Sequence, residues 1–140
     1  MKNSTIAAKL CTLFDQKITS FYRESYKGLV GKSQLEVLNY LHLNKKAKSQ
    51  EIADSLSIPK QHASKILIKF EEENIVQCKV DETDKRAKIY TLTDEGLKLI
   101  ESHLKVSNKN FDDLLDKLNE KEQRDFVEAM KIMLKLLEKM

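Results

Sequence analysis

The chain has 140 residues, of which 41% are hydrophobic and 34% are charged, and a formal net charge of +3. This length suits one domain with an added oligomerisation element, and the apolar fraction excludes wholesale disorder. Only 3 Gly and 1 Pro are present, which excludes a turn-rich sandwich or barrel and favours long helices joined by short turns.

The sequence carries no sign of a membrane or secreted protein. No uninterrupted apolar run exceeds three residues, so no membrane span is predicted. The first residues, MKNST, lack the apolar stretch of a signal peptide. Cys11 and Cys78 lie far apart and make no disulfide framework, which fits a reduced interior. We therefore expect a cytoplasmic protein.

The N-terminal part of the chain predicts two helices. Apolar residues recur at three- and four-residue intervals from Ser4 to Tyr26, which is the pattern of an amphipathic helix, and Gly28 and Gly31 interrupt it. A second helix is predicted to start at Ser33, because Ser33-Gln34-Leu35-Glu36 has the spacing of a capping box. The stretch Asn44–Lys48 is predicted to be a polar connection.

Two closely spaced helices are predicted next. Ser49 is the expected N-cap of a short helix that ends at about Leu56. Pro59 is tolerated in the first turn of a helix and not in its interior, so it marks the start of the following helix, which runs to about Glu73. Asn74 follows at a place where a helix end needs a left-handed residue.

The apolar period then changes from helical to alternating. Ile75–Val80 and Ala87–Leu92 are predicted to be two short strands around the polar stretch Asp81–Arg86. Thr93-Asp94-Glu95 caps a new helix with its acids in the first turn. A break near Asn119 separates this helix from the last one.

This order of elements predicts a mainly α fold with a small β-hairpin, a winged helix-turn-helix with terminal helices. We expect an N-terminal dimerisation helix and linker in residues 1–32, a DNA-binding lobe in residues 33–96 and C-terminal dimerisation helices in residues 97–140. Ile132 and Leu136 add to the main apolar stripe of the last helix, so that helix must be buried between neighbours. The alternative to a dimer is a larger monomeric core.

The helix from Pro59 to Glu73 carries the predicted base-reading residues. At about 100° per residue, its buried side consists of Ala63, Ile66, Leu67 and Phe70. The opposite side presents Gln61, Ser64, Lys65 and Ile68, with His62 and Lys69 on its flank. Only the first turns of such a helix reach base edges in a major groove. The predicted base-reading residues are therefore Gln61, His62, Ser64 and Lys65, and the alternative is an ordinary solvated face.

The predicted hairpin turn carries charges of both signs. A guanidinium at the end of a β-ribbon suits a narrow minor groove, which predicts that role for Arg86. Asp84 is predicted to orient this guanidinium by a charge-assisted hydrogen bond. The predicted phosphate contacts are Lys60, Lys69, Lys85 and Lys88. The alternative is a charged turn that is merely solvated.

Asp84-Lys85-Arg86, followed by Leu92-Thr93-Asp94-Glu95-Gly96, resembles the wing and the next helix start of the MarR family, the multiple-antibiotic-resistance regulators. The family pattern is Asp-x-Arg and then Leu-Thr-x-x-Gly at this distance. Glu51-Ile52-Ala53 and Ala63–Val76 resemble the family's helix-turn-helix, with Asn74 where Gly is usual. The resemblance spans essentially the whole chain. It implies a homodimeric repressor or activator that binds a pseudo-palindromic operator in double-stranded DNA and dimerises through its first and last helices.

Two residues depart from the family pattern. Lys65 stands where Arg is common, and a lysine offers a point charge in place of a bidentate fork for guanine. Pro59 stands where a Ser or Thr N-cap is common, so the first turn must be capped in another way or by a phosphate. Ser49 and Gln50, at the start of the preceding short helix, complete the set of predicted DNA contacts.

Regulation is expected through a small-molecule effector lodged between the DNA-binding lobe and the dimerisation helices, and the sequence names no ligand and no cofactor. Some relatives in the family that the chain resembles sense oxidants through a cysteine in the first helix, assisted by tyrosines. Cys11, with Tyr22, Tyr26 and Tyr40, is therefore a candidate redox site. The alternative is an inert, buried cysteine.

The sequence contains no constellation that indicates catalysis or a metal site. It has no Gly-rich phosphate loop and no nucleophile elbow, so we predict no enzyme. His42, His103 and Glu24 do not share a metal-ligand spacing, and no Cys-x-x-Cys occurs, so we predict no metal site. The alternative function is a winged-helix module for protein interaction that does not bind DNA.

Overall fold

The computed structural model describes residues 2–20 and 31–140. The chain divides into two compact units: a terminal-helix unit, which comprises Met1–Phe21 and Val106–Met140, and a central lobe, which comprises Tyr22–Lys105. The last part of the first predicted helix, residues 21–26, and Gly28 lie outside the described residues. The functional segments predicted at 1–32, 33–96 and 97–140 stay a prediction.

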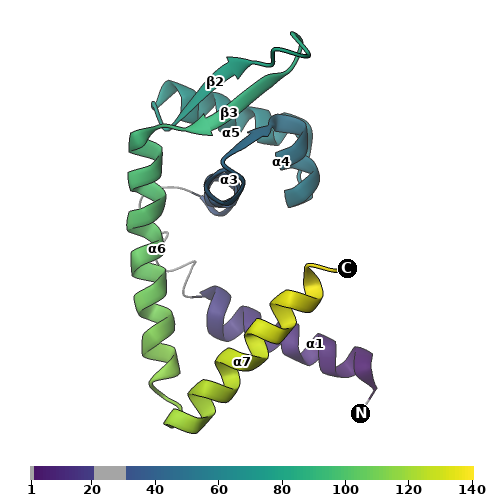
Figure 1. Ribbon diagram of the computed structural model, residues 1–140, viewed down its shortest axis with the longest axis vertical. Coiled ribbons are helices and arrows are strands. Elements are labelled where there is room, and N and C mark those ends of the chain that lie inside the picture. The colour runs from purple at the N-terminus through teal and green to yellow at the C-terminus, as the bar shows by residue number, and fades with distance from the viewer. Residues whose placement is uncertain (1, 21–30) are drawn as a thin grey trace. The chain divides into compact units, whose positions relative to one another are not determined.

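Helices and a three-stranded antiparallel sheet form the central lobe (Figure 1). In chain order its elements are α3 (Lys32–Asn44), β1 (Lys46–Lys48), α4 (Ser49–Leu56), α5 (Lys60–Glu72), β2 (Val76–Val80), β3 (Lys88–Leu92) and the start of α6 (Asp94–Leu115). The strand order is β1-β3-β2. The turn between β2 and β3 projects beyond the helices of the lobe as a wing (Figure 1). The predicted winged helix fold is confirmed.

The strand β1 corrects the prediction that Asn44–Lys48 is only a polar connection. Lys46–Lys48 pair with β3, with Ala47 opposite Tyr90, and Ala47 is buried. A single apolar residue between two lysines gives too little alternation to indicate a strand. The strand forms because β3 supplies a paired neighbour that is distant in sequence.

The core of the lobe lies between α3, α4, α5 and the sheet. Its buried apolar side chains are Leu35, Val37, Leu38, Leu41, Ala47, Ile52, Ala53, Ala63, Ile66, Leu67, Phe70, Val76, Tyr90 and Ile100. The four residues predicted to form the buried side of α5 are all among them. Burial of this stripe orients α5, and it turns the opposite side of the helix outward.

The start of α3 differs from the predicted one. The N-cap is Gly31 and not Ser33, which lies inside the first turn. The side-chain oxygen of Gln34 accepts a hydrogen bond from the backbone N–H of Gly31 at 3.4 Å. The capping contact thus pairs Gly31 with Gln34, two residues earlier than the predicted pairing of Ser33 with Glu36.

The junction between α5, β2 and α6 is held by Thr93 and Gly96. Asn74 takes the predicted left-handed conformation, with φ 59°. The Thr93 hydroxyl lies 2.6 Å from the carbonyl oxygen of Asn74 and accepts a hydrogen bond from the Gly96 N–H at 3.1 Å. The Thr93 N–H donates to the carbonyl oxygen of Ile75 at 3.0 Å. The predicted cap of α6 is therefore confirmed, and it also ties α6 to the end of α5.

The terminal-helix unit contains α1 (Asn3–Phe14), a π-helical turn η1 (Asp15–Thr19), the C-terminal part of α6 and α7 (Glu120–Leu137). The π turn corrects the prediction of one regular α-helix, because spacings of three and four residues do not reveal a local five-residue bond. Asn119 is the N-cap of α7, as the predicted break required, and accepts a hydrogen bond from the Glu122 N–H. The rings of Phe111 and Phe126, 6.4 Å apart, pack α6 against α7.

Both α1 and α7 carry apolar side chains that this chain alone does not cover. No residue of either helix is buried within the described structure. The exposed large apolar side chains are Ile6, Leu10, Leu13 and Phe14 on α1, and Ile132, Met133, Leu134, Leu136 and Leu137 on α7. These helices are nevertheless not membrane spans, since no helix in residues 2–20 and 31–140 has the length and apolar content that a span needs.

We expect Gly96→Ala to destabilise the central lobe by about 1–3 kcal/mol. A Cβ at this position would collide with the backbone carbonyl oxygen of Ile75, which cannot move without breaking the junction. The measurement is urea unfolding followed by circular dichroism. Gly31→Ala is the comparison and should cost less, because a Cβ at Gly31 meets nothing within 4 Å and only the N-cap preference of α3 changes. Equal unfolding midpoints for the two variants would contradict this role of Gly96.

Candidate nucleic-acid interface

The outward side of α5 presents the residues that the sequence predicted as base contacts. Gln61, His62, Lys65 and Lys69 are exposed and Ser64 is half-buried. They lie opposite the buried stripe, as a helix with 3.6 residues per turn requires. Lys69 Nζ lies 4.0 Å from Glu73 Oε1, and both side chains are about half exposed, so this ion pair contributes little to stability. The structure therefore brings these groups onto one solvent-facing surface.

The beginning of α5 has the properties of an anion site. Pro59 is the N-cap, with φ −58°, and no side chain among the described residues caps the helix. The first backbone N–H groups of an uncapped helix carry a partial positive charge. Lys60, the first residue of α5, is exposed beside them. A phosphate group is chemically suited to this position.

The wing turn is closed by backbone hydrogen bonds and by Asp84. The Asp81 N–H donates to the Ala87 carbonyl oxygen at 2.9 Å, and the Ala87 N–H donates to the Asp84 carbonyl oxygen at 3.0 Å. The Asp84 carboxylate accepts a hydrogen bond from the backbone N–H of Arg86 at 3.1 Å. This contact differs from the predicted one, because the carboxylate holds the backbone of the turn and not the guanidinium. The cationic side chains of Lys85, Arg86 and Lys88 are exposed.

An ion pair that the sequence analysis missed joins the wing to the start of the helix-turn-helix. Lys48 Nζ lies 3.0 Å from Asp81 Oδ2, with side chains that are 40% and 12% exposed. The Asp81 Oδ1 atom accepts hydrogen bonds from the Thr83 N–H at 3.1 Å and hydroxyl at 2.9 Å. The Lys48 contact, followed by those from Thr83, lowers the pKa of Asp81 to about 2. The Asp-x-Thr spacing signals the local turn, but nothing in the sequence indicates the pairing with Lys48.

The start of α4 also differs from the predicted one. Lys48 is the N-cap, and its N–H donates to the Glu51 carboxylate at 3.2 Å, while Ser49 is the first helical residue and is half-buried. Gln50 is exposed, and its side-chain amide donates to Asp54 at 2.7 Å. Ser49 and Gln50 thus lie at the N-terminus of α4, where a phosphate would meet helix N–H groups.

Among the described residues, the candidate redox and metal residues are not gathered into a site. Cys11 is exposed on α1, and Cys78 is half-buried on β2. Tyr40 accepts a hydrogen bond from Ser55 at 3.4 Å, while Tyr22, Tyr26 and Glu24 lie outside the described residues. In the described part of the chain, no three His, Cys, Asp or Glu residues are placed to hold a metal ion. Redox sensing through Cys11 stays a prediction.

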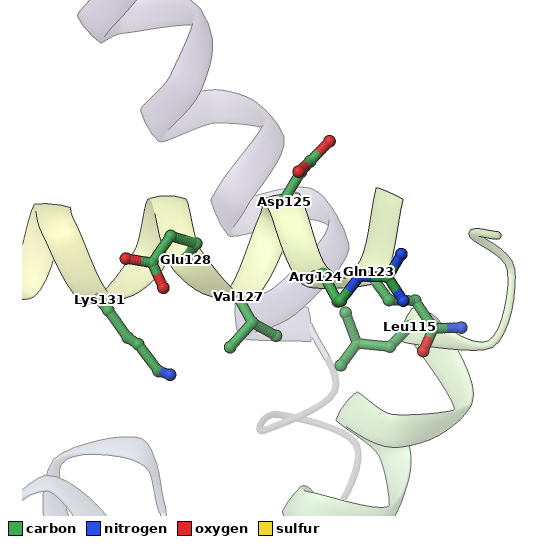
Figure 2. A pocket seen from close by; sticks show the side chains of 7 residues that line it. All are labelled: Leu115, Gln123, Arg124, Asp125, Val127, Glu128 and Lys131. Carbon is green, nitrogen blue, oxygen red and sulfur yellow. The ribbon is translucent and has the colours of Figure 1, made fainter. Parts of the chain in front are cut away.

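Two hollows lie within the terminal-helix unit. One, of about 460 Å³, is lined almost entirely by apolar side chains of α1, α6 and α7, with Lys17 and Lys117 at its edge. The other lies along α7 and the end of α6 (Figure 2) and is lined by Leu115, Gln123, Arg124, Asp125, Val127, Glu128 and Lys131. Figure 2 shows Asp125 pointing away from the side of α7 that carries Val127 and Lys131. Asp125 is paired instead with Lys121, at 2.7 Å.

Known proteins share this fold. The family of winged helix DNA-binding domains matches residues 34–110. A Cys-to-Ser mutant of MarR from E. coli has a TM-score of 0.80 at 19% identity, over 91% of this chain and 95% of that one. A Phe-to-Leu mutant of MepR from S. aureus, bound to an oligodeoxyribonucleotide, has a TM-score of 0.68 at 22% identity, over 94% and 97%. The YusO protein from Bacillus subtilis has a TM-score of 0.69 at 29% identity, over 96% of this chain and 94% of that one.

No curated protein matches the chain in sequence. The likeness is therefore carried by the family match and by the solved structures. Together they confirm the predicted resemblance to MarR-type proteins, at the level of the fold and over nearly the whole chain.

We expect Asp81→Asn to remove a pH-dependent part of the stability. The pKa of Asp81 is about 2 in the folded protein against the usual 3.8. The ionised carboxylate therefore stabilises the fold above about pH 4, and this contribution is lost as the pH falls from about 4 to about 2. Urea unfolding at several pH values should show the wild type losing its advantage over Asp81→Asn in that range.

Glu82→Gln is the matched control for this experiment, because Glu82 is an exposed neighbour in the same turn. The free energy of unfolding of Glu82→Gln should follow that of the wild type down to pH 2. A stability difference between wild type and Asp81→Asn that stays constant from pH 5 to pH 2 would contradict the role of the Lys48–Asp81 pair.

Proposed function

The chain belongs to the family of winged helix DNA-binding domains, and we propose that it is a homodimeric transcriptional regulator of MarR type that binds a pseudo-palindromic operator. A single observation carries the proposal. The outward side of α5, apart from Ile68, and the wing turn expose polar and cationic groups, while the opposite side of α5 is buried in the core. Such a surface suits the grooves and phosphates of a duplex.

In this proposal the first turns of α5 enter the major groove. Gln61 pairs with adenine, Lys65 with guanine, and His62 and Ser64 contact base edges more permissively. These side chains start from a helix whose buried stripe fixes its rotation. Base readout therefore needs little further ordering of the protein when DNA binds.

Phosphate contacts surround this base-reading surface. We assign them to Lys60 and Lys69 on α5, to Lys85 and Lys88 on the wing, and to the N-terminus of α4 at Ser49 and Gln50. Arg86 enters the minor groove, where the guanidinium meets an enhanced negative potential. The Asp84 carboxylate holds the backbone N–H of Arg86, which supports a fixed direction for the side chain that follows.

The exposed apolar faces of α1 and α7 support the homodimer. Leu134 and Leu137 are 60% and 61% exposed in the single chain, and burying such faces is the main driving force for association. A second copy covers them in our proposal. It also places two α5 helices on one face of the duplex about one helical turn apart, the spacing that a palindromic operator needs.

A small-molecule effector completes the proposed regulator. The apolar hollow of about 460 Å³ in the terminal-helix unit has the size and lining of a small-molecule site, and this supports the presence of an effector. The expected position between the lobe and the terminal helices stays a prediction. A bound effector would act by changing the spacing of the two α5 helices.

The salt dependence of duplex binding tests the proposed function. Four lysine–phosphate contacts in each copy give eight in the dimer, so log K should fall with log salt with a slope of about −7. Fluorescence anisotropy between 50 and 200 mM salt measures this slope. Failure to bind any duplex at 50 mM salt would contradict DNA binding. It would favour the alternative function, a winged-helix module for protein interaction.

The same assay tests the wing. Arg86→Ala should weaken binding most at operators with an A·T-rich flank, where the minor groove is narrow. Arg124→Ala, which removes an exposed arginine from α7, is the matched control and should leave the affinity unchanged. Equal affinities for wild type and Arg86→Ala at every flank would remove Arg86 from the interface.

We expect Leu137→Asp to separate the dimer. A carboxylate in an apolar interface is costly, so the dissociation constant of the dimer should rise by about a hundredfold or more. Sedimentation equilibrium measures this constant. Leu43→Asp alters a side chain that is 70% exposed on the central lobe, and this control should stay dimeric. A dimeric Leu137→Asp protein at the same concentration would contradict the role of α7.

A further inference from the structure

The outward side of α5 contains one apolar side chain, Ile68. It is 53% exposed, whereas Ile66 and Leu67 beside it are buried. At 100° per residue, Ile68 lies about 20° from Gln61 and about 40° from Ser64 around the helix axis. Around the helix axis, Ile68 therefore lies on the same side as Gln61 and Ser64, and along the helix it lies about one turn beyond Lys65, at the far end of the proposed base-reading face.

The position of Ile68 along the helix places it within reach of the same groove. Seven residues at 1.5 Å each separate it from Gln61 by about 10.5 Å, which is about three base-pair steps of B-DNA. The next residue on this side is Glu72, which is exposed and would be repelled by phosphates. The readable part of the face thus begins at Gln61 and ends at Ile68.

The major groove offers one apolar group on its base edges. This is the C5-methyl group of thymine, whereas cytosine carries only a hydrogen at C5, and the purines present N7 and the oxygen or amino group at position 6. An isoleucine in the groove cannot satisfy a base donor or acceptor, so it would leave a polar edge desolvated and unpaired. Contact with a thymine methyl removes apolar surface on both partners from water instead.

We propose that Ile68 reads the methyl group of a thymine in each half-site, about three base pairs from the base that Gln61 contacts. The proposal rests on DNA binding by α5 and adds a specificity-determining residue to it. Ile68 thereby sets a preference that hydrogen-bonding residues alone do not supply, since polar side chains gain little from the methyl group.

The test removes the methyl group from the DNA. An operator obtained by selection from random duplexes is resynthesised with each thymine of one half-site replaced in turn by deoxyuridine, which keeps every hydrogen-bonding group. At one thymine, the wild-type affinity should fall by about fourfold, the factor that corresponds to burying one methyl-sized group. At the other thymines of the half-site, the affinity should change less.

Variants of the protein assign this effect to Ile68. Ile68→Ala should bind the thymine and deoxyuridine duplexes equally, and Ile68→Val should retain part of the discrimination. Leu43→Ala, an exposed apolar residue elsewhere on the lobe, should discriminate as the wild type does. Because Ile68 is exposed on a helix, Ile68→Ala should fold normally, and thermal unfolding checks this.

Two results would overturn the proposal while leaving DNA binding intact. The first is a half-site in which no thymine is sensitive to loss of its methyl group, or one that contains no thymine. The second is an Ile68→Ala protein that remains as sensitive to deoxyuridine as the wild type. Absence of binding to every duplex is a different result, because it would remove the proposed function together with this inference.

Discussion

The orientation of α5, which carries the proposed base-reading face, depends on a close backbone approach between Gly96 and the carbonyl group of Ile75. Only a residue without a Cβ fits there, and the Thr93 hydroxyl links the carbonyl of Asn74 to the N–H of Gly96. The end of α5, the base of the wing and the start of α6 therefore meet at one rigid point. The Leu-Thr-x-x-Gly motif therefore meets a packing requirement at this junction, and in our proposal the junction also fixes the side of α5 that faces the duplex.

The wing is fixed at a second point, far from this junction. The Lys48–Asp81 ion pair joins the last residue of β1 to the residue that follows β2. Lys48 is also the N-cap of α4. One lysine thus connects the wing to the helix that precedes α5. The two candidate DNA-contacting parts of the lobe, α5 and the wing turn, therefore hold a defined mutual position before any duplex is present, which lowers the cost of ordering them on binding.

The elements that sequence analysis predicted well are those with a local physical cause. The rotation of α5 follows from helical periodicity, the left-handed Asn74 from its place after a helix, and the α6 cap from Thr93. Sequence analysis did not predict three features that depend on long-range pairing or on a single backbone bond. These are the strand β1, the Lys48–Asp81 ion pair and the π turn at Asp15–Thr19. The predictions of Ser33 and Ser49 as N-caps were wrong, since the side chains of Gln34 and Glu51 accept hydrogen bonds from Gly31 and Lys48 instead.

In our proposal, two copies of this lobe read one duplex through paired α5 helices. The most direct measurement is selection of bound duplexes from a random DNA pool by the purified full chain, followed by sequencing. We expect enrichment of an inverted repeat whose half-sites lie about 10 base pairs apart, centre to centre, or a multiple of that distance. Enrichment of an asymmetric site, or recovery of the pool with no preferred sequence, would contradict it.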